Sequence, residues 1–199
     1  MSRSDNNWQK IAMIGASSGL GATLLEALVH DQPQAKILAV SQSQPQVSQL
    51  LENVSWFKTD FSVGPEQEKL LLQLEEFAPQ LLICALSKDS STDVSWNLIV
   101  STLFPARLWR WASAQQAVEQ AVVVGPDGSG KIGLSALLQT LAFDNPKADL
   151  RLYSPPATSA KVRQAAAWSS EEIAKDLIVW LKHGPRFDHR RLAVTPSAR

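Results

Sequence analysis

The sequence predicts a three-layer α/β domain, in which helices cover both faces of a doubly wound parallel sheet. Two observations predict it. Strand-like and helix-like segments alternate along the 199-residue chain, and a glycine-rich turn joins the first strand to the first helix. Such alternation builds right-handed βαβ units, whose strands lie parallel in one sheet. We expect a single domain over residues 1–199, with strand order 3-2-1-4-5-6 and room for a seventh strand.

The predicted strands are short apolar runs, each followed by a turn or a helical pattern. Pro105 is expected to kink the longest helix. Glu172 would complete a capping box at the start of the last helix, and Gly184-Pro185 would end it. The predicted strands are Lys10–Ile14, Lys36–Val40, Val54–Lys58, Leu81–Leu86, Ala121–Val124, Leu150–Tyr153 and an edge strand Leu192–Val194. The predicted helices are Leu20–Val29, a short stretch after the Gln/Ser-rich loop 42–49, Glu66–Phe77, Val94–Gln116, Ile132–Phe143 and one starting at Ser169 or Ser170.

Composition excludes several classes of partner. Nineteen basic residues balance nineteen acidic ones, so no overall charge would draw nucleic acid or an anionic membrane surface. No signal peptide is visible, and the longest apolar runs are too short to span a bilayer, so we expect a cytoplasmic protein. The single cysteine, Cys84, excludes an intramolecular disulfide and falls within a predicted strand, where we expect it to be inert. The three histidines are scattered and indicate no metal site.

Gly15, Gly19 and Gly21 form the most informative motif, with the spacing G-x-x-x-G-x-G between a strand and a helix. Backbone N–H groups and the helix dipole at such a turn can hold a pyrophosphate, and the hydroxyls of Ser17 and Ser18 can reach phosphate oxygens. A turn of this kind can also be kept for strand–helix packing alone, with no dinucleotide bound.

With Ala16-Ser17-Ser18 between its glycines, the motif resembles that of the short-chain dehydrogenase/reductase (SDR) family. The resemblance covers nearly the whole chain and implies a Rossmann-like fold with NAD or NADP at the carboxyl ends of the strands. It also implies that Leu20 follows the motif in the cofactor site, that Asp60 and Phe61 pack near the adenine, and that Ala85 borders the cofactor. Leu86 stands where the family has a glycine that gives the cofactor room.

The end of the second strand mildly favours NADP over NAD. No Asp or Glu lies between Asp31 and Glu52, so the carboxylate that usually grips the ribose 2′-hydroxyl is missing. Ser41, Gln42 and Ser43 could instead face a 2′-phosphate, although no arginine or lysine follows them.

The catalytic motif of the family, Tyr-x-x-x-Lys, is kept only in part. Lys131 matches the lysine, but Asp127 stands in place of the tyrosine, and the single tyrosine, Tyr153, falls in the sixth strand. The family's serine is absent, and its asparagine corresponds to Asn97 or, aligned on Pro105, to Ser101. Reduction of a carbonyl needs a positioned proton donor, and an aspartate near a lysine is normally ionised.

Two functions therefore compete. The first is an SDR-type oxidoreductase for a small carbonyl or alcohol, in which Lys131 positions the nicotinamide ribose and Asp127, Ser129 or water replaces the tyrosine. The second is a non-catalytic NAD(P)-binding sensor or scaffold. A remote third reading is a P-loop nucleotide binder, because Gly125 to Lys131 spells G-x-x-x-x-G-K, but Ile132 replaces the Ser or Thr that would hold Mg²⁺.

A homodimer is the expected assembly. The helix Val94–Gln116 carries more apolar surface than one sheet face should need, and the chain has seven tryptophans that suit either a core or an interface. Family members commonly pair through this helix and the one predicted at Ile132–Phe143. The apolar residues of the first helix are Trp96, Leu103, Phe104, Leu108, Trp109 and Trp111.

Overall fold

The computed structural model describes residues 7–17, 19–44, 52–86, 98–124, 149–153 and 169–183. Six parallel strands form one sheet in the order β3-β2-β1-β4-β5-β6, which confirms the predicted fold class and strand order. The strands are β1 (Lys10–Ile14), β2 (Lys36–Ser41), β3 (Val54–Lys58), β4 (Leu81–Cys84), β5 (Gln120–Val124) and β6 (Asp149–Tyr153). The predicted helix Ile132–Phe143 and the predicted edge strand Leu192–Val194 lie outside the described residues.

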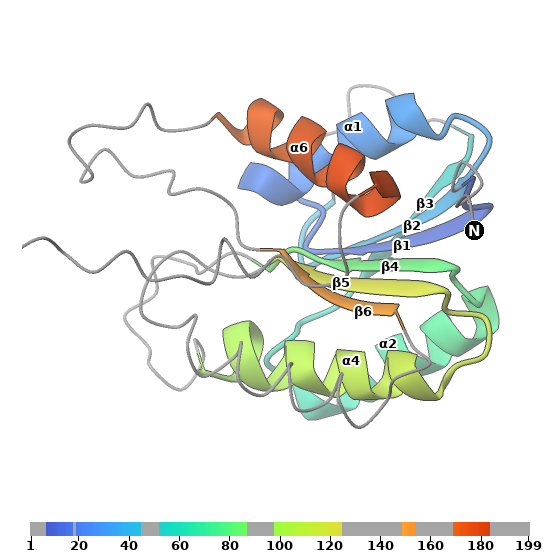
Figure 1. The fold of residues 1–199 in the computed structure, drawn as a ribbon. Helices are drawn as coiled ribbons and strands as arrows, with labels where there is room; N and C mark the ends of the chain where they lie inside the picture. Colours follow the sequence, from blue (N-terminus) through green and yellow to red (C-terminus); the bar gives the residue numbers. More distant parts are fainter. Residues whose placement is uncertain are drawn as a thin grey trace, which may run out of the picture.

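Helices cover both faces of the sheet (Figure 1). On one face lie α1 (Gly19–Asp31) and α6 (Ser170–His183), and on the other lie α2 (Gly64–Phe77) and α4 (Phe104–Ala114). Side chains alternate along each strand between two cores. Ile11 and Met13 of β1 join the core under α1 and α6, whereas Ala12 and Ile14 join the core under α2 and α4.

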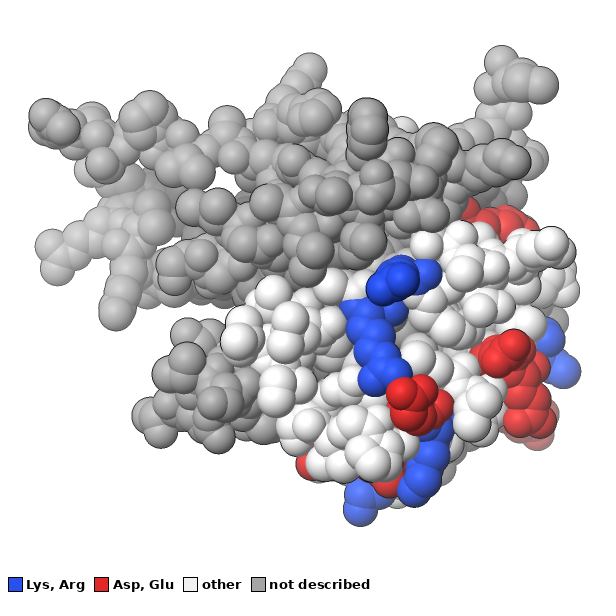
Figure 2. Space-filling view, turned by 90° about the horizontal axis from the view of Figure 1, so that it is seen from below, with Lys and Arg blue, Asp and Glu red and all other residues white. Residues whose placement is uncertain are grey.

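The α2/α4 face carries charges of both signs. Arg107 of α4 donates hydrogen bonds to Gln67 and Glu68 of α2, which ties the two helices together across the surface. Figure 2 shows basic and acidic side chains next to each other on this face, with uncharged residues around them. The described part of the face therefore presents no field of one sign.

A π-helical turn, Ile99–Leu103, precedes α4 at the place where the sequence predicts a kink. Pro105 lacks an N–H and cannot close the α-helical hydrogen bond to the fourth residue before it, so a wider turn accommodates the proline. Phe104, Leu108 and Trp109 are buried in the core of their own chain, and Trp111 packs partly against it. The sequence predicts that these side chains exceed what one sheet face could bury. For these residues that prediction is wrong, because they pack against the sheet of their own chain.

The C-terminal end of α6 is fixed to the sheet by Arg151 of β6, which is fully buried. Its guanidinium donates to both carboxylate oxygens of Asp149 and to the carbonyls of Trp180 and Leu181, at 2.9–3.2 Å. Carbonyls in the last turn of a helix have no helical partner, so the arginine satisfies them. At the other end, Ser169 and Glu172 exchange the two hydrogen bonds of the predicted capping box.

Other element boundaries differ from the prediction by one or two residues, which is usual at fraying ends. None of the helices within the described ranges has the length and apolar content needed to cross a membrane.

Candidate functional site

The glycine-rich turn lies between the carboxyl ends of β1, β2 and β4. Gly15 has a φ of +87°, and its N–H and that of Ala16 donate to the carbonyl of Val40 at 2.8 and 3.2 Å. A Cβ on Gly15 would stand 2.6 Å from the carbonyl oxygen of Ala85. Both the positive φ and this contact require glycine at position 15.

Gly21 brings α1 directly onto this turn. A Cβ at Gly21 would lie 1.8 Å from the carbonyl oxygen of Gly15, a distance that no side chain can occupy. The glycine is buried, so its role is close packing between the helix and the turn. Gly15 and Gly21 are therefore explained by the fold without a ligand.

Gly19 differs from the other two glycines of the motif. It is the exposed first residue of α1, its φ is +52°, and a Cβ there would meet no atom of the described residues within 4 Å. The first N–H groups of α1, which include those of Leu20 and Gly21, have no acceptor within the helix. Backbone donors and open space meet here, an arrangement that suits a phosphate group.

The side chains on either side of Gly19 take different environments. Leu20 is half-buried and packs partly against the core under α1 and α6. Ser17 is half-buried, and its hydroxyl makes no hydrogen bond with the part of the chain that the structure describes. Ser18 lies outside that part.

Ser41 does not present its hydroxyl to a ligand, so this part of the expectation is wrong. The side chain is buried; its hydroxyl donates to the carbonyl of Ser43 at 2.6 Å and accepts from Trp56 Nε1 at 3.1 Å. Parallel pairing places Trp56 opposite Ala39, on the same sheet face as Ser41. Trp56 is fifteen positions from Ser41, so the sequence alone does not predict this contact. Gln42 and Ser43 are exposed and remain candidates.

Asp60 follows β3 and is bonded within the turn after that strand. Its Oδ1 accepts from the backbone N–H and the hydroxyl of Ser62, at 2.9 and 2.6 Å. The hydroxyl bond of Ser62 is the main cause that lowers the pKa of Asp60, against a smaller effect of burial, and hydrogen bonds from the Ser62 backbone and from Gln42 add to it. Asp60 is therefore an anion at neutral pH.

Phe61 is a core residue rather than a wall of the site. It is buried, and its ring centroid lies 5.4 Å from that of Phe104 on α4. The expected contact of its side chain with an adenine is wrong, because the ring points into the α2/α4 core.

Ala85 and Leu86 border the turn on the β4 side. The backbone N–H of Ala85 donates to the carbonyl of Ile14 at 2.9 Å, and its own carbonyl lies against Gly15. Leu86 is half-buried, with Cδ2 3.3 Å from the position that a Cβ on Gly15 would take. A leucine side chain thus stands beside the glycine turn.

The expected catalytic residues Asn97, Asp127 and Lys131 lie outside the described residues, as does the glycine-rich segment 125–131. Ser101, the other candidate for the asparagine position, lies in the π-helical turn. Tyr153 is buried and donates to Asp176 Oδ2 at 2.6 Å.

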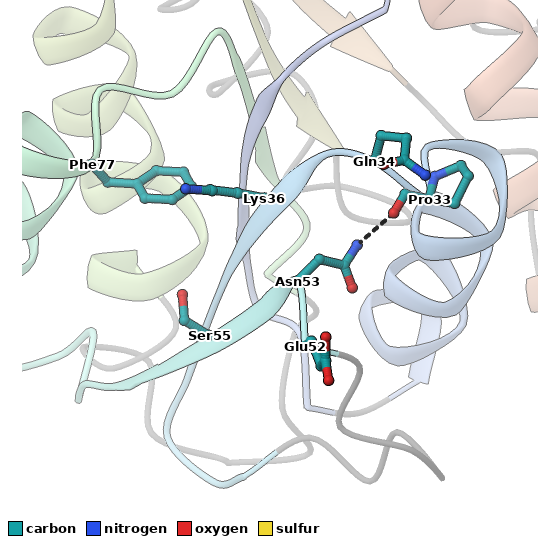
Figure 3. A pocket seen from close by; sticks show the side chains of 7 residues that line it. All are labelled: Pro33, Gln34, Lys36, Glu52, Asn53, Ser55 and Phe77. Carbon is teal, nitrogen blue, oxygen red and sulfur yellow. Dashed lines mark hydrogen bonds between the residues drawn. The ribbon is translucent and has the colours of Figure 1, made fainter.

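A separate hollow of about 360 Å³ lies at the amino-terminal ends of β2 and β3 (Figure 3). Asn53 spans it at one side, where its amide donates to the carbonyl of Pro33 at 3.3 Å. The hollow is lined in part by Lys36 and Phe77 and contains none of the predicted site residues. Within the described ranges, no group of three or more His, Cys, Asp or Glu side chains could hold a metal ion.

Solved structures of short-chain dehydrogenases share this architecture. One match is a carbonyl reductase from Pseudomonas aeruginosa PAO1 in complex with NADP, with TM-score 0.70 and 20% identity over 92% of this chain and 97% of that one. A short chain dehydrogenase family protein from Francisella tularensis gives TM-score 0.64 and 15% identity over 88% and 91%. A short chain dehydrogenase from Leptospira borgpetersenii with bound NAD+ gives TM-score 0.56 and 17% identity over 86% and 78%.

These likenesses establish that the chain has the Rossmann-like α/β fold that SDR structures share. No protein-family model matches the sequence, and no curated protein matches it.

Proposed function

We propose that this protein binds NAD(P) at the glycine turn and acts as an SDR-type oxidoreductase on a small carbonyl or alcohol. The observation that carries the binding proposal is Gly19. Packing explains Gly15 and Gly21, but Gly19 faces open space at the N-terminus of α1. A bare backbone at this point, at the carboxyl ends of the central strands, is what a pyrophosphate needs.

The other groups suited to the cofactor surround this point. The first N–H groups of α1 and the hydroxyl of Ser17 would hold the pyrophosphate, and Gln42 with Asp60 would border the adenosine. Lys131 would bind the nicotinamide ribose. Bound nicotinamide would supply or accept the hydride, and Asp127, Ser129 or water would handle the proton at the substrate oxygen. The lack of an acidic residue from 41 to 44 favours NADP.

One observation favours a second candidate, a non-catalytic NAD(P)-binding sensor or scaffold. The chain's single tyrosine is buried and bonded to Asp176, so no tyrosine is available as the proton donor of a hydride transfer. Such a protein would bind the cofactor as tightly as an enzyme does but turn nothing over.

Calorimetric titration with NAD+, NADH, NADP+ and NADPH tests the binding proposal. We expect binding to the wild type and its loss in Gly19→Asn. Asparagine tolerates a positive φ, so the fold should survive while the new side chain fills the phosphate space. Gly64→Ala is the matched control. A Cβ on Gly64 also meets no described atom within 4 Å, but Gly64 lies at the start of α2 and not at the glycine turn. If no nicotinamide cofactor binds the wild type, the glycines serve packing alone.

Turnover then separates the two candidates. The protein is first saturated with whichever reduced cofactor it binds, NADH or NADPH. It is then mixed with a panel of small aldehydes and ketones, and oxidation of the cofactor is followed by absorbance. Oxidation that Lys131→Met abolishes supports the oxidoreductase. Tight binding without oxidation of the cofactor by any of them supports the sensor.

A further inference from the structure

Lys58, the last residue of β3, lies beside the end of β2. Parallel pairing places Lys58 opposite Ser41, and neighbouring strands in a sheet lie about 4.8 Å apart. The glycine turn adjoins the same end of β2, because Gly15 and Ala16 both donate to the carbonyl of Val40. The turn, the end of β2 and Lys58 therefore follow one another along the carboxyl edge of the sheet.

The face on which Lys58 stands is fixed by strand alternation. Trp56 and Lys58 are two residues apart in β3 and share one face. The indole of Trp56 donates to Ser41, so this is also the face of the Ser41 side chain. On that face the hydroxyl of Ser41 is already bonded to the carbonyl of Ser43 and to the indole of Trp56.

Lys58 is free to bind an anion. It is exposed, and it makes no hydrogen bond or ion pair with the described residues. The carboxylate two residues further on, Asp60, accepts two hydrogen bonds from Ser62. A lysine is a compact cation on a flexible stem and suits a phosphate as a point charge.

We propose that Lys58 binds the 2′-phosphate of NADP and makes the site prefer NADP to NAD. The inference rests on the proposed function, since it requires a dinucleotide on the glycine turn with its adenosine over the end of β2. It supplies the cation that the loop after β2 lacks. The sequence alone conceals this cation, because Lys58 is seventeen positions from Ser41 and only strand pairing brings the two together.

The test is calorimetric titration of the folded protein with NADPH and NADH. We expect the wild type to bind NADPH more tightly, with a preference that declines as salt is added. Lys58→Gln should weaken NADPH binding about five- to tenfold and leave NADH binding unchanged, whereas Lys58→Arg should keep the preference. Lys36→Gln is the matched control, because Lys36 is an exposed lysine at the opposite end of β2 and should affect neither cofactor.

The contrary results distinguish a failure of the role of Lys58 from a failure of the proposed function. Equal binding of NADH and NADPH by the wild type, or a Lys58→Gln variant that weakens both cofactors or neither, overturns the role of Lys58 and leaves the proposed function standing. Failure of the wild type to bind any nicotinamide cofactor overturns the proposed function itself, and the role of Lys58 with it.

Discussion

Tyr153 of β6 donates a hydrogen bond of 2.6 Å to Asp176 of α6, so the one phenol of the chain joins the sheet to this helix. The ring lies in the core under α1 and α6 and packs 5.5 Å from that of Trp180. These contacts lead us to expect that Tyr153 contributes to the stability of the fold.

Tyr153→Phe should accordingly lower the free energy of unfolding by about 1–2 kcal/mol, because a buried hydrogen bond to a carboxylate is lost. Cofactor affinity and any turnover should stay as in the wild type. Urea unfolding and calorimetric titration measure the two effects. A variant that is as stable as the wild type but has lost turnover would show that Tyr153 takes part in chemistry.

Gly21→Ala should be among the most damaging single-methyl changes in this chain. The added Cβ would collide with the carbonyl oxygen of Gly15, a backbone atom that cannot turn away. We expect a loss of about 3 kcal/mol or more, at the upper end for overpacking, whereas Gly64→Ala should be neutral. Thermal unfolding of both variants checks this, and an unchanged Gly21→Ala protein would mean that α1 does not rest on the turn.

Ser62 should control the ionisation of Asp60. Because the pKa of Asp60 is lowered on folding, its carboxylate stabilises the native state above the unfolded pKa, near 3.8, and this contribution is lost as pH falls through the folded pKa. Ser62→Ala removes the main cause, so the pKa should rise toward its ordinary value and the acid-dependent loss of stability should shrink.

Carbon NMR titration of the Asp60 carboxyl group measures the shift directly, and urea unfolding at neutral and acid pH measures its consequence. Ser113→Ala, which removes a hydroxyl that bonds within α4, is the control and should not move the Asp60 titration. An unshifted pKa in Ser62→Ala would assign the lowering to the backbone and Gln42 instead.

Cys84 should react with thiol reagents only when the protein unfolds. Burial raises the pKa of its thiol to about 12, so almost no thiolate forms in the native state at neutral pH. Maleimide labelling at pH 7 should be slow in buffer and fast in concentrated urea. Rapid labelling of the folded protein would mean that β4 opens to solvent.

The homodimer stays a prediction, but the structure changes the residues on which it depends. Phe104, Leu108 and Trp109 are buried, whereas Leu98 and Leu103 are about half exposed, at 52% and 51%. Light scattering should give twice the chain mass of 21.8 kDa, and Leu103→Glu should return the mass to that of one chain. Val179 is exposed on α6, which covers the other face of the sheet, so Val179→Glu should leave the dimer intact. A wild-type protein of single-chain mass would refute the dimer.

The sequence by itself determined the fold class and the order of the strands. Local patterns suffice for this, because each apolar run specifies a strand, each period of 3.6 residues a helix, and right-handed crossovers then leave few topologies. The same locality explains why the capping box of Ser169 and Glu172 could be predicted, because its two residues are three positions apart. Gly21 packs on Gly15, six positions away, whereas the contact of Gly15 with Ala85 arises only from the pairing of β1 with β4.

Only the tertiary structure decided which side chains face the site, because that depends on neighbours distant in sequence. The sequence predicts a ligand contact for the Ser41 hydroxyl, but the pairing of β2 with β3 places the indole of Trp56 on it. It also predicts a place in the site for Phe61, but the ring packs against Phe104 of α4. The same pairing brought Lys58 to the end of β2. Strand register and helix packing are set by the collective burial of apolar surface over the whole domain, which no short stretch of sequence contains.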